Sequence, residues 1–241
     1  MKRTLVISDI HGCYDEFVDL LDDMKYQANV DQLIILGDLV DKGPKSKDVI
    51  ELVITLFEEG NVIILRGNHD QRFIDVMSQE GHSEERKFYE HGGIQALNSY
   101  LELTSSSTEE EKLRLAREII NKEYKHHLTF LESLTYYYED QNHIYVHAGL
   151  NPLYENWKEQ PLRDFMYIKD PFIYEKTKVD KKVIFGHTKT KDIHGTPDIW
   201  FADDKIGIDG GCSNGMQLNG LEISDDLNYK QFKVDSRQSK G

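Results

Sequence analysis

Short apolar runs that end in polar side chains recur along this chain. Residues 4–8, 33–36, 62–65, 143–146 and 183–185 are such runs, and each is followed within two residues by a glycine, an aspartate or a histidine. An apolar run of this length next to a turn signal is typical of a buried strand that ends in a loop. Five strand ends therefore present polar side chains from which a functional site can be built.

Helical periodicity alternates with these runs in the first third of the chain. Apolar residues recur at i, i+3, i+4 and i+7 in 17–24, again in 49–56, and start a third series at residue 73. Strand, helix and strand in succession are typical of a βαβ unit. Three such repeats in the first eighty residues predict a layered α/β fold.

The rest of the chain changes character twice. Residues 83–134 favour helices, with a capping box formed by Ser107 and Glu110 or by Thr108 and Glu111. Short runs at 198–201, 205–208, 217–223 and 229–234 suggest an antiparallel second sheet. We expect a single domain over 1–235, with a helical insert at about 83–134 and a polar tail at 236–241.

Composition limits the partners and the compartment. A formal net charge of -14 argues against a nucleic-acid polymer or an anionic membrane surface, because little cationic surface is present to displace counterions. Cys13 and Cys212 are too few for a disulfide framework, and no run reaches the length of a signal peptide or a membrane span. The sequence therefore predicts a cytoplasmic protein with free thiols.

The polar residues at the strand ends suit a metal site. Asp9 and His11 are two residues apart, Asp38 follows Gly37, and Asn68 follows Gly67. Parallel strands bring their carboxyl ends to one edge of a sheet, where ligands bind in open α/β folds. A set of Asp, His and Asn without cysteine favours manganese, iron or zinc, and it is large enough for two ions.

Two such ions would also explain how a protein with a net charge of -14 can bind an anionic phosphate. At a separation of about 3.5–4 Å they would bridge a hydroxide, lower its pKa towards neutrality and hold the oxygens of a phosphoryl group during in-line displacement. They would make the pocket locally positive in an acidic protein, so an anionic phosphate could enter.

The strand-end stretches together resemble the successive motifs of the calcineurin-like metallophosphoesterases. The nearest branch is the phosphoprotein phosphatase type, which includes bacterial and phage serine/threonine phosphatases and diadenosine tetraphosphatases. The motifs are Asp9-Ile10-His11-Gly12, Gly37-Asp38 with Asp41-Lys42-Gly43, Gly67-Asn68-His69-Asp70, Val146-His147 with Gly149, and Gly186-His187-Thr188. The resemblance covers nearly the whole chain and implies an α/β fold, a four-layer αββα sandwich of two mixed β-sheets flanked by helices.

The resemblance also implies a role for each motif residue. Two divalent ions, Mn²⁺ or alternatively Fe or Zn, would be held by Asp9 and His11 on one side, by Asn68, His147 and His187 on the other, and by Asp38 as the bridge. His69 would donate a proton to the leaving oxygen, and Asp41 would orient its ring. Two alternatives stay open: His69 as a further metal ligand or a structural loop histidine, and Asp41 as a turn residue.

Two lysines depart from the family pattern. Protein phosphatases typically carry arginine where this chain has Lys42, and a second arginine where it has Lys169; Arg163 is an alternative for the second contact. Lysine keeps the positive charge but lacks the planar fork that fits phosphate.

These features predict a metal-dependent phosphoesterase. A serine/threonine-type protein phosphatase is the first expectation, and a bis(5'-nucleosyl)-tetraphosphatase acting on diadenosine tetraphosphate is close behind. A non-catalytic metal-bound scaffold is a third hypothesis, which the complete ligand set makes less attractive. The expected partner is a phosphorylated protein or a small phosphate ester or dinucleotide, with no nucleic-acid polymer and no membrane; the oligomeric state stays open.

Overall fold

The chain forms two five-stranded sheets in the computed structural model, which describes residues 3–78, 82–101 and 108–238. The first sheet has the order β10-β9-β1-β2-β3, formed by β1 (Thr4–Ile7), β2 (Gln32–Ile35), β3 (Val62–Ile64), β9 (Gln217–Ile223) and β10 (Tyr229–Asp235). The second has the order β4-β5-β6-β8-β7, formed by β4 (Tyr137–Glu139), β5 (His143–Val146), β6 (Lys182–Phe185), β7 (Trp200–Phe201) and β8 (Lys205–Gly207). Both sheets are mixed: β1, β2 and β3 run parallel, as do β5, β6 and β8.

Strand alternation explains why the two sheets stack face to face. Successive side chains of a strand point to opposite faces. In β1, Leu5 and Ile7 pack into the core under the helices, while Val6 packs into the apolar layer between the sheets. In β5, Tyr145 enters that same layer from the other side, and its neighbours Ile144 and Val146 face the opposite way. Three buried clusters therefore separate four layers.

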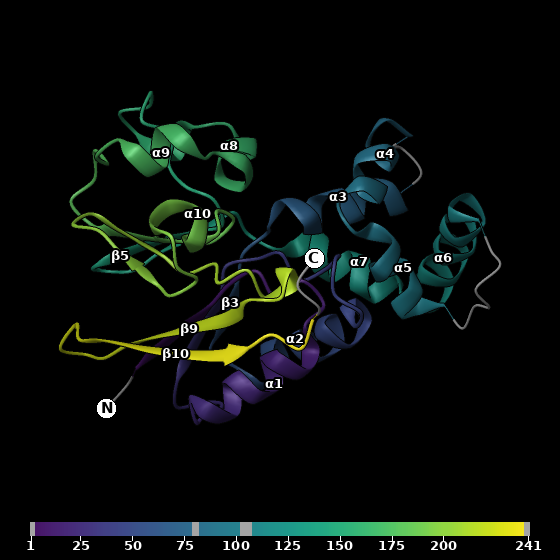
Figure 1. The fold of residues 1–241 in the computed structure, drawn as a ribbon, viewed down its shortest axis with the longest axis horizontal. Helices are drawn as coiled ribbons and strands as arrows, with labels where there is room; N and C mark the ends of the chain where they lie inside the picture. Colours follow the sequence, from purple (N-terminus) through teal and green to yellow (C-terminus); the bar gives the residue numbers. More distant parts are fainter. Residues whose placement is uncertain (1–2, 79–81, 102–107, 239–241) are drawn as a thin grey trace.

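Helices form the two outer layers (Figure 1). The first sheet is covered by α1 (Tyr14–Asp23) and α2 (Ser46–Glu59), and α3 (Asn68–Met77) joins the same core. The second sheet is covered by α8 (Leu162–Tyr167), α9 (Asp170–Tyr174) and α10 (Thr190–His194), at the upper left of Figure 1. The remaining helices extend to the right of that view: α4 (His82–Glu90), α5 (Gly93–Tyr100), α6 (Glu109–Glu123) and α7 (Lys125–Ser133). This architecture confirms the predicted four-layer αββα sandwich.

One expectation about the sheets was wrong. The last four strands do not form a separate antiparallel sheet, because β9 pairs with β1 and β10 pairs with β9 in the first sheet. Only β7 and β8 join the second sheet, where β8 lies parallel to β6. The alternation of apolar residues sets which face of a strand is buried, but it does not set which strand is its neighbour.

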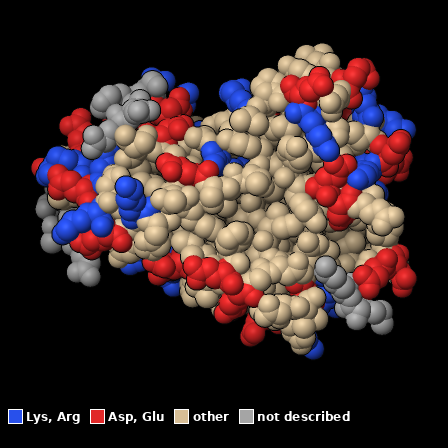
Figure 2. Space-filling view, turned by 180° about the vertical axis from the view of Figure 1, so that it is seen from behind, with Lys and Arg blue, Asp and Glu red and all other residues tan. Residues whose placement is uncertain are grey.

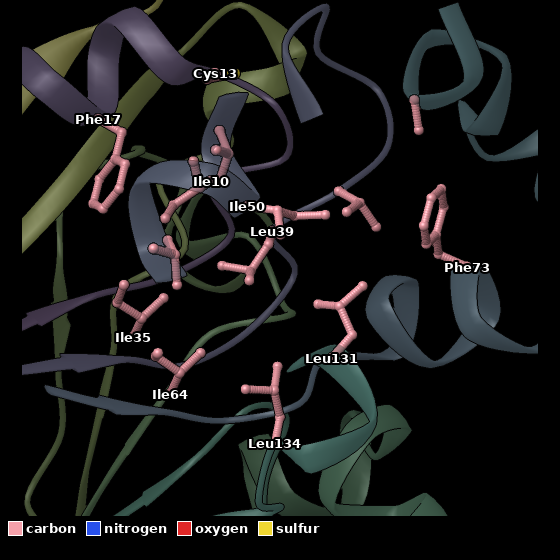
Figure 3. Packing of buried hydrophobic residues seen from close by; sticks show 14 of the residues in the cluster. Ile10, Cys13, Phe17, Ile35, Leu39, Ile50, Ile64, Phe73, Leu131 and Leu134 are labelled. Carbon is pink, nitrogen blue, oxygen red and sulfur yellow. The ribbon is translucent and has the colours of Figure 1, made fainter. Parts of the chain in front are cut away.

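The core reaches directly beneath the loops that follow the strands (Figure 3). Ile10 and Leu39 belong to two of these loops, and both are fully buried. They pack in the same cluster as Phe73 of α3 and Ile50 of α2. A dense interior fixes side chains in single rotamers, so the apolar residues of the loops hold the neighbouring polar residues in place.

The end of the chain differs from the predicted free tail. Arg237 donates its backbone N–H to Glu16 Oε1 over 2.7 Å and pairs with Asp19, so residues 236–238 dock on α1. Residues 239–241 lie outside the described residues. The helices α4 to α7 fall in the stretch where an insert was expected, and the unity of 1–235 as one domain stays a prediction.

Surface charge follows the acidic composition. On the face in Figure 2, lysine and arginine side chains are interspersed with aspartate and glutamate, which gather along the lower edge of that view. No helix within 3–78, 82–101 or 108–238 has both the length and the apolar character to cross a bilayer.

Candidate active site

The loops after β1, β2, β3, β5 and β6 meet in one open cleft with about 970 Å³ of empty space. Backbone hydrogen bonds hold these loops together beyond the strands: Asp9 donates its N–H to Gly37, and His11 donates its N–H to Asp38. The cleft is lined by Asp9, His11, Asp38, Lys42, Asn68, His69, Arg72, His91, Tyr167, Lys169, His187, Lys189, Asp209, Ser213 and Asn214. His147 is buried behind it.

Backbone strain is concentrated in these loops. Left-handed backbone is unfavourable for residues with a Cβ and collects at functional sites. The non-glycine residues with positive φ include Asp9, His11, Asp38, Asp41, Lys42 and His187. Two glycines permit the close contacts around them: a Cβ on Gly67 would lie 2.1 Å from Asp38 Oδ1, and a Cβ on Gly37 would lie 2.4 Å from the Gly67 nitrogen.

Two histidines direct their Nε2 atoms at the same carboxylate. Nδ1 of His11 bonds to the Val40 carbonyl at 2.8 Å, and Nδ1 of His147 bonds to the Leu36 carbonyl at 2.9 Å. A ring nitrogen that donates to a carbonyl leaves the lone pair on the other nitrogen. Nε2 of His11 and Nε2 of His147 lie 3.4 and 3.5 Å from Asp38 Oδ2, so this oxygen faces both.

The remaining predicted ligands surround this arrangement. Asn68 Oδ1 lies 3.1 Å from His147 Nε2. Asp9 Oδ1 lies 3.9 Å from His11 Nε2, and the other Asp9 oxygen accepts the backbone N–H of His187 at 3.0 Å. Nε2 of His187 is buried and finds no hydrogen-bond partner among the described residues. All six predicted metal ligands are thus brought together.

These residues fit two divalent cations. Two triads, each with ligand atoms within 4.8 Å of one another, share Asp38: one adds His11 and His69, the other His147 and His187. The orphaned Nε2 of His187 and the mixture of carboxylate, imidazole and amide donors are what such a cation needs. The Lys42 ammonium lies 2.7 Å from His11 Nε2, so positive charge is accommodated at this point.

The pKa shifts of the clustered residues agree with a cation site in the cleft. Burial raises the pKa of Asp9 and of Asp38, and a neighbouring carboxylate adds to the rise in each case: Asp38 for Asp9, and Asp70 for Asp38. Burial, together with the charge of Lys42, lowers the pKa of His11 well below its usual value. Burial lowers the pKa of His187 in the same way. Neutral imidazoles keep a lone pair for a metal, and a metal would relieve the repulsion between the carboxylates.

His69 and Asp41 form a buried pair beside the triads. Nδ1 of His69 lies 2.7 Å from Asp41 Oδ2, and neither side chain is more than 7% exposed. Burial raises the pKa of Asp41 well above its usual range and lowers the pKa of His69 well below its own. Burial therefore disfavours a charge on either member of the pair.

The family model for calcineurin-like phosphoesterases matches residues 2–206. The chain belongs to this family. A curated bis(5'-nucleosyl)-tetraphosphatase of the asymmetrical kind from Anoxybacillus flavithermus is 26% identical over 90% of this chain and 88% of its own length. A symmetrical one from Buchnera aphidicola is 44% identical over 30% of this chain and 25% of its own length. Several matches to symmetrical relatives thus span only a fraction of those proteins.

A solved structure described as a putative diadenosine tetraphosphatase shares the fold. It matches this phosphoesterase with a TM-score of 0.63 and 21% identity, over 98% of this chain and 95% of its own. At this identity the likeness concerns the arrangement of the layers and not the substrate.

The third motif of this phosphoesterase starts a helix and not a loop. Asn68 and His69 are the first two residues of α3. Asp70 caps this helix, because its carboxylate accepts the Gly67 N–H at 2.9 Å. The same carboxylate accepts the backbone N–H groups of Asp38 at 2.8 Å and Leu39 at 2.9 Å. Asp70, fully buried, therefore ties the second motif to the third.

We expect Asp70→Asn to destabilise the protein by about 2–4 kcal/mol. An amide offers one acceptor oxygen, so at least one of the three backbone N–H groups would face an N–H₂ group in a buried place. Urea unfolding of the variant measures the change, with Asp75→Asn on the same helix as the control. A loss below 0.5 kcal/mol would show that water replaces the carboxylate.

The predicted phosphate contacts lie at the cleft. Lys42 and Lys169 both line it. Arg163 is not among the described residues that line it, and its guanidinium stacks on the ring of Tyr167 at 4.7 Å. Lys169 is exposed, whereas Lys42 is half-buried against His11. Their roles stay predictions.

The cleft also contains titratable residues that the sequence analysis did not assign to the site, among them His91, Asp209 and Arg72. His91 belongs to none of the sequence motifs, yet its ring centroid lies 6.3 Å from that of His69. Asp209 is buried, and burial with the nearby charge of Asp9 raises its pKa to about 7. Arg72 lies three residues after His69, which places both on one face of α3. This spacing is the one sequence feature that could have pointed to Arg72 as a residue of the site.

Proposed function

We propose that this phosphoesterase hydrolyses dinucleoside tetraphosphates. The observation that carries the proposal is the similarity, over 90% of the chain, to a curated tetraphosphatase. A second observation supports a long substrate: a groove with about 1560 Å³ of empty space shares Lys189 and Asn214 with the cleft. A nucleoside at one end and phosphates at the other would fit such a pair of spaces.

The residues of the cleft suit this chemistry. Asp9, His11 and Asp38 would hold one divalent cation, and Asp38, Asn68, His147 and His187 the other. When bound, such cations act as Lewis acids that polarise a phosphoryl oxygen and activate water. The chain itself supplies the proton and the orientation.

His69 would donate the proton to the leaving oxygen. Its Nδ1 is held by Asp41, so Nε2 is the nitrogen that faces the cleft. The proton on Nε2 of His69 would pass to the oxygen of the phosphate group that leaves. Asp41 would keep its hydrogen bond to Nδ1 and so stabilise the ring while this proton is transferred. Lys42 and Lys169, on the wall of the cleft, would offset the charge of the polyphosphate chain.

The metal-loaded protein should split diadenosine tetraphosphate into ATP and AMP, because the relative matched over most of its length is the asymmetrical kind. Anion-exchange chromatography after incubation with Mn²⁺ identifies the products. Two molecules of ADP would instead indicate symmetrical cleavage and would still support the substrate class.

A phosphopeptide assayed in parallel is the decisive comparison. Release of inorganic phosphate from the peptide, at a kcat/KM above that for the dinucleotide, would favour the protein phosphatase prediction and overturn the proposal. No turnover of either compound, or of an aryl phosphate, with any divalent ion would leave the non-catalytic scaffold.

A further inference from the structure

A buried guanidinium without a matching acceptor lies in the wall of the cleft. Arg72 is only 5% exposed, and its Nε and Nη1 atoms find no hydrogen-bond partner among the described residues. The nearest carboxylate oxygen, Oε2 of Glu84, is 4.0 Å from Nε, which is beyond hydrogen-bonding distance. Glu84 thus pairs with Arg72 by charge alone and leaves the N–H donors of Nε and Nη1 without acceptors in the described part of the chain. Buried donors of this kind are costly unless they are hydrogen-bonded, so their retention calls for an anionic acceptor.

The position of Arg72 selects the kind of anion. It lies on α3 three residues after His69, and it lines the same cleft as Lys42 and Lys169. Its charge lowers the pKa of Asp41 against the effect of burial and also lowers the pKa of His91, so it acts electrostatically on the centre of the site.

We propose that Arg72 binds the non-bridging oxygens of the substrate phosphoryl group through its planar fork. An arginine presents two parallel N–H donors to phosphate, which a lysine cannot do. Lys42 faces His11 and Lys169 is exposed, so Arg72 supplies the one buried fork at the cleft among the residues that line it. The inference rests on the proposed hydrolysis of phosphate esters.

Asp41 is a competing partner for Arg72 within the protein. Asp41 carries a buried oxygen, Oδ1, without a hydrogen-bond partner in the described chain, and the charge of Arg72 lowers the pKa of this carboxyl against the larger effect of burial. If Arg72 served only to neutralise the pair of Asp41 and His69, it would change proton transfer and not phosphate binding. The two roles therefore predict different measurements.

Inorganic phosphate is the probe that separates them. Titration calorimetry on the Mn²⁺-loaded protein gives its Kd without any turnover. We expect Arg72→Lys to weaken phosphate binding by about 10- to 100-fold, because one charge-assisted hydrogen bond of the fork is lost. Arg86→Lys, whose arginine is 85% exposed on α4, is the matched control and should leave the Kd unchanged.

Three outcomes overturn the inference. They are an unchanged Kd in Arg72→Lys, a change confined to kcat and its pH profile, and a wild-type protein that binds no phosphate. Should Arg72→Lys not fold, Glu84→Gln decides, since removal of the nearest carboxylate should free the guanidinium and tighten phosphate about threefold. An unchanged Kd in that variant would contradict the proposal. Failure of dinucleotide hydrolysis alone would refute the proposed substrate, and the phosphate titration would still test Arg72.

Discussion

Asp38→Asn is expected to abolish tight binding of both divalent cations and to lower kcat/KM by about 10³-fold or more. Asp38 Oδ2 faces His11 and His147 at 3.4 and 3.5 Å, so it is the one carboxylate common to both candidate triads. The amide would retain an oxygen for the backbone N–H of His69, which Asp38 Oδ1 accepts at 2.9 Å. The loss should therefore arise from charge and not from a collapsed loop.

Metal analysis after equilibrium dialysis and thermal unfolding test this expectation together. Burial raises the pKa of Asp38, so its charged form opposes folding at neutral pH when no cation compensates it. Without metal, the variant should thus be at least as stable as the wild type. With Mn²⁺ at about 100 times its Kd, only the wild type should gain stability, by about 2.7 kcal/mol for each ion bound.

The exposed Asp226→Asn is the matched control, and it should behave as the wild type in each measurement. An Asp38→Asn protein that keeps two ions per chain would show that the bridge lies elsewhere. Wild-type turnover in that variant would remove the metal site from the mechanism.

The sequence predicted the strand ends well for a physical reason. An apolar run that stops at a glycine must leave the sheet there, and in parallel strands these exits share one edge. That rule predicted that these strand ends would meet, whereas the six ligand roles and the pairing of His69 with Asp41 came from the family resemblance. The capping box of Thr108 and Glu111 is a local feature, and both of its hydrogen bonds are present.

Features set by packing between distant segments could not be predicted. Arg72 reads from the sequence as one more polar residue of an amphipathic helix, and only the packing of α4 against α3 buries it. Asp209 stands before two glycines and reads as a turn; its proximity to Asp9 requires that the loops of the two sheets meet. The place of β9 beside β1 is set in the same way, because alternation gives the buried face and not the neighbour.

His69→Asn is expected to lower kcat for diadenosine tetraphosphate by about 10²- to 10⁴-fold with little change in KM, the range usual for loss of a general acid. An aryl phosphate with a nitro-substituted leaving group needs less protonation, so its kcat should fall much less. Two metal ions should remain bound, because the proposed role of His69 is proton donation to the substrate. His69 nevertheless lies in a triad with His11 and Asp38.

The alternative role gives the opposite signature. If His69 is a metal ligand, the variant loses one ion per chain and the two substrates are affected equally. Asp41→Asn should reproduce the dependence on the leaving group at smaller amplitude, about 10- to 100-fold, since it removes only the group that orients the ring at 2.7 Å. His194→Asn, at an exposed histidine of α10, is the control and should change neither rate. Metal content and leaving-group dependence are measured independently. Two bound ions together with a strong leaving-group dependence identify His69 as the proton donor, whereas the loss of one ion with equal effects on both substrates identifies it as a metal ligand.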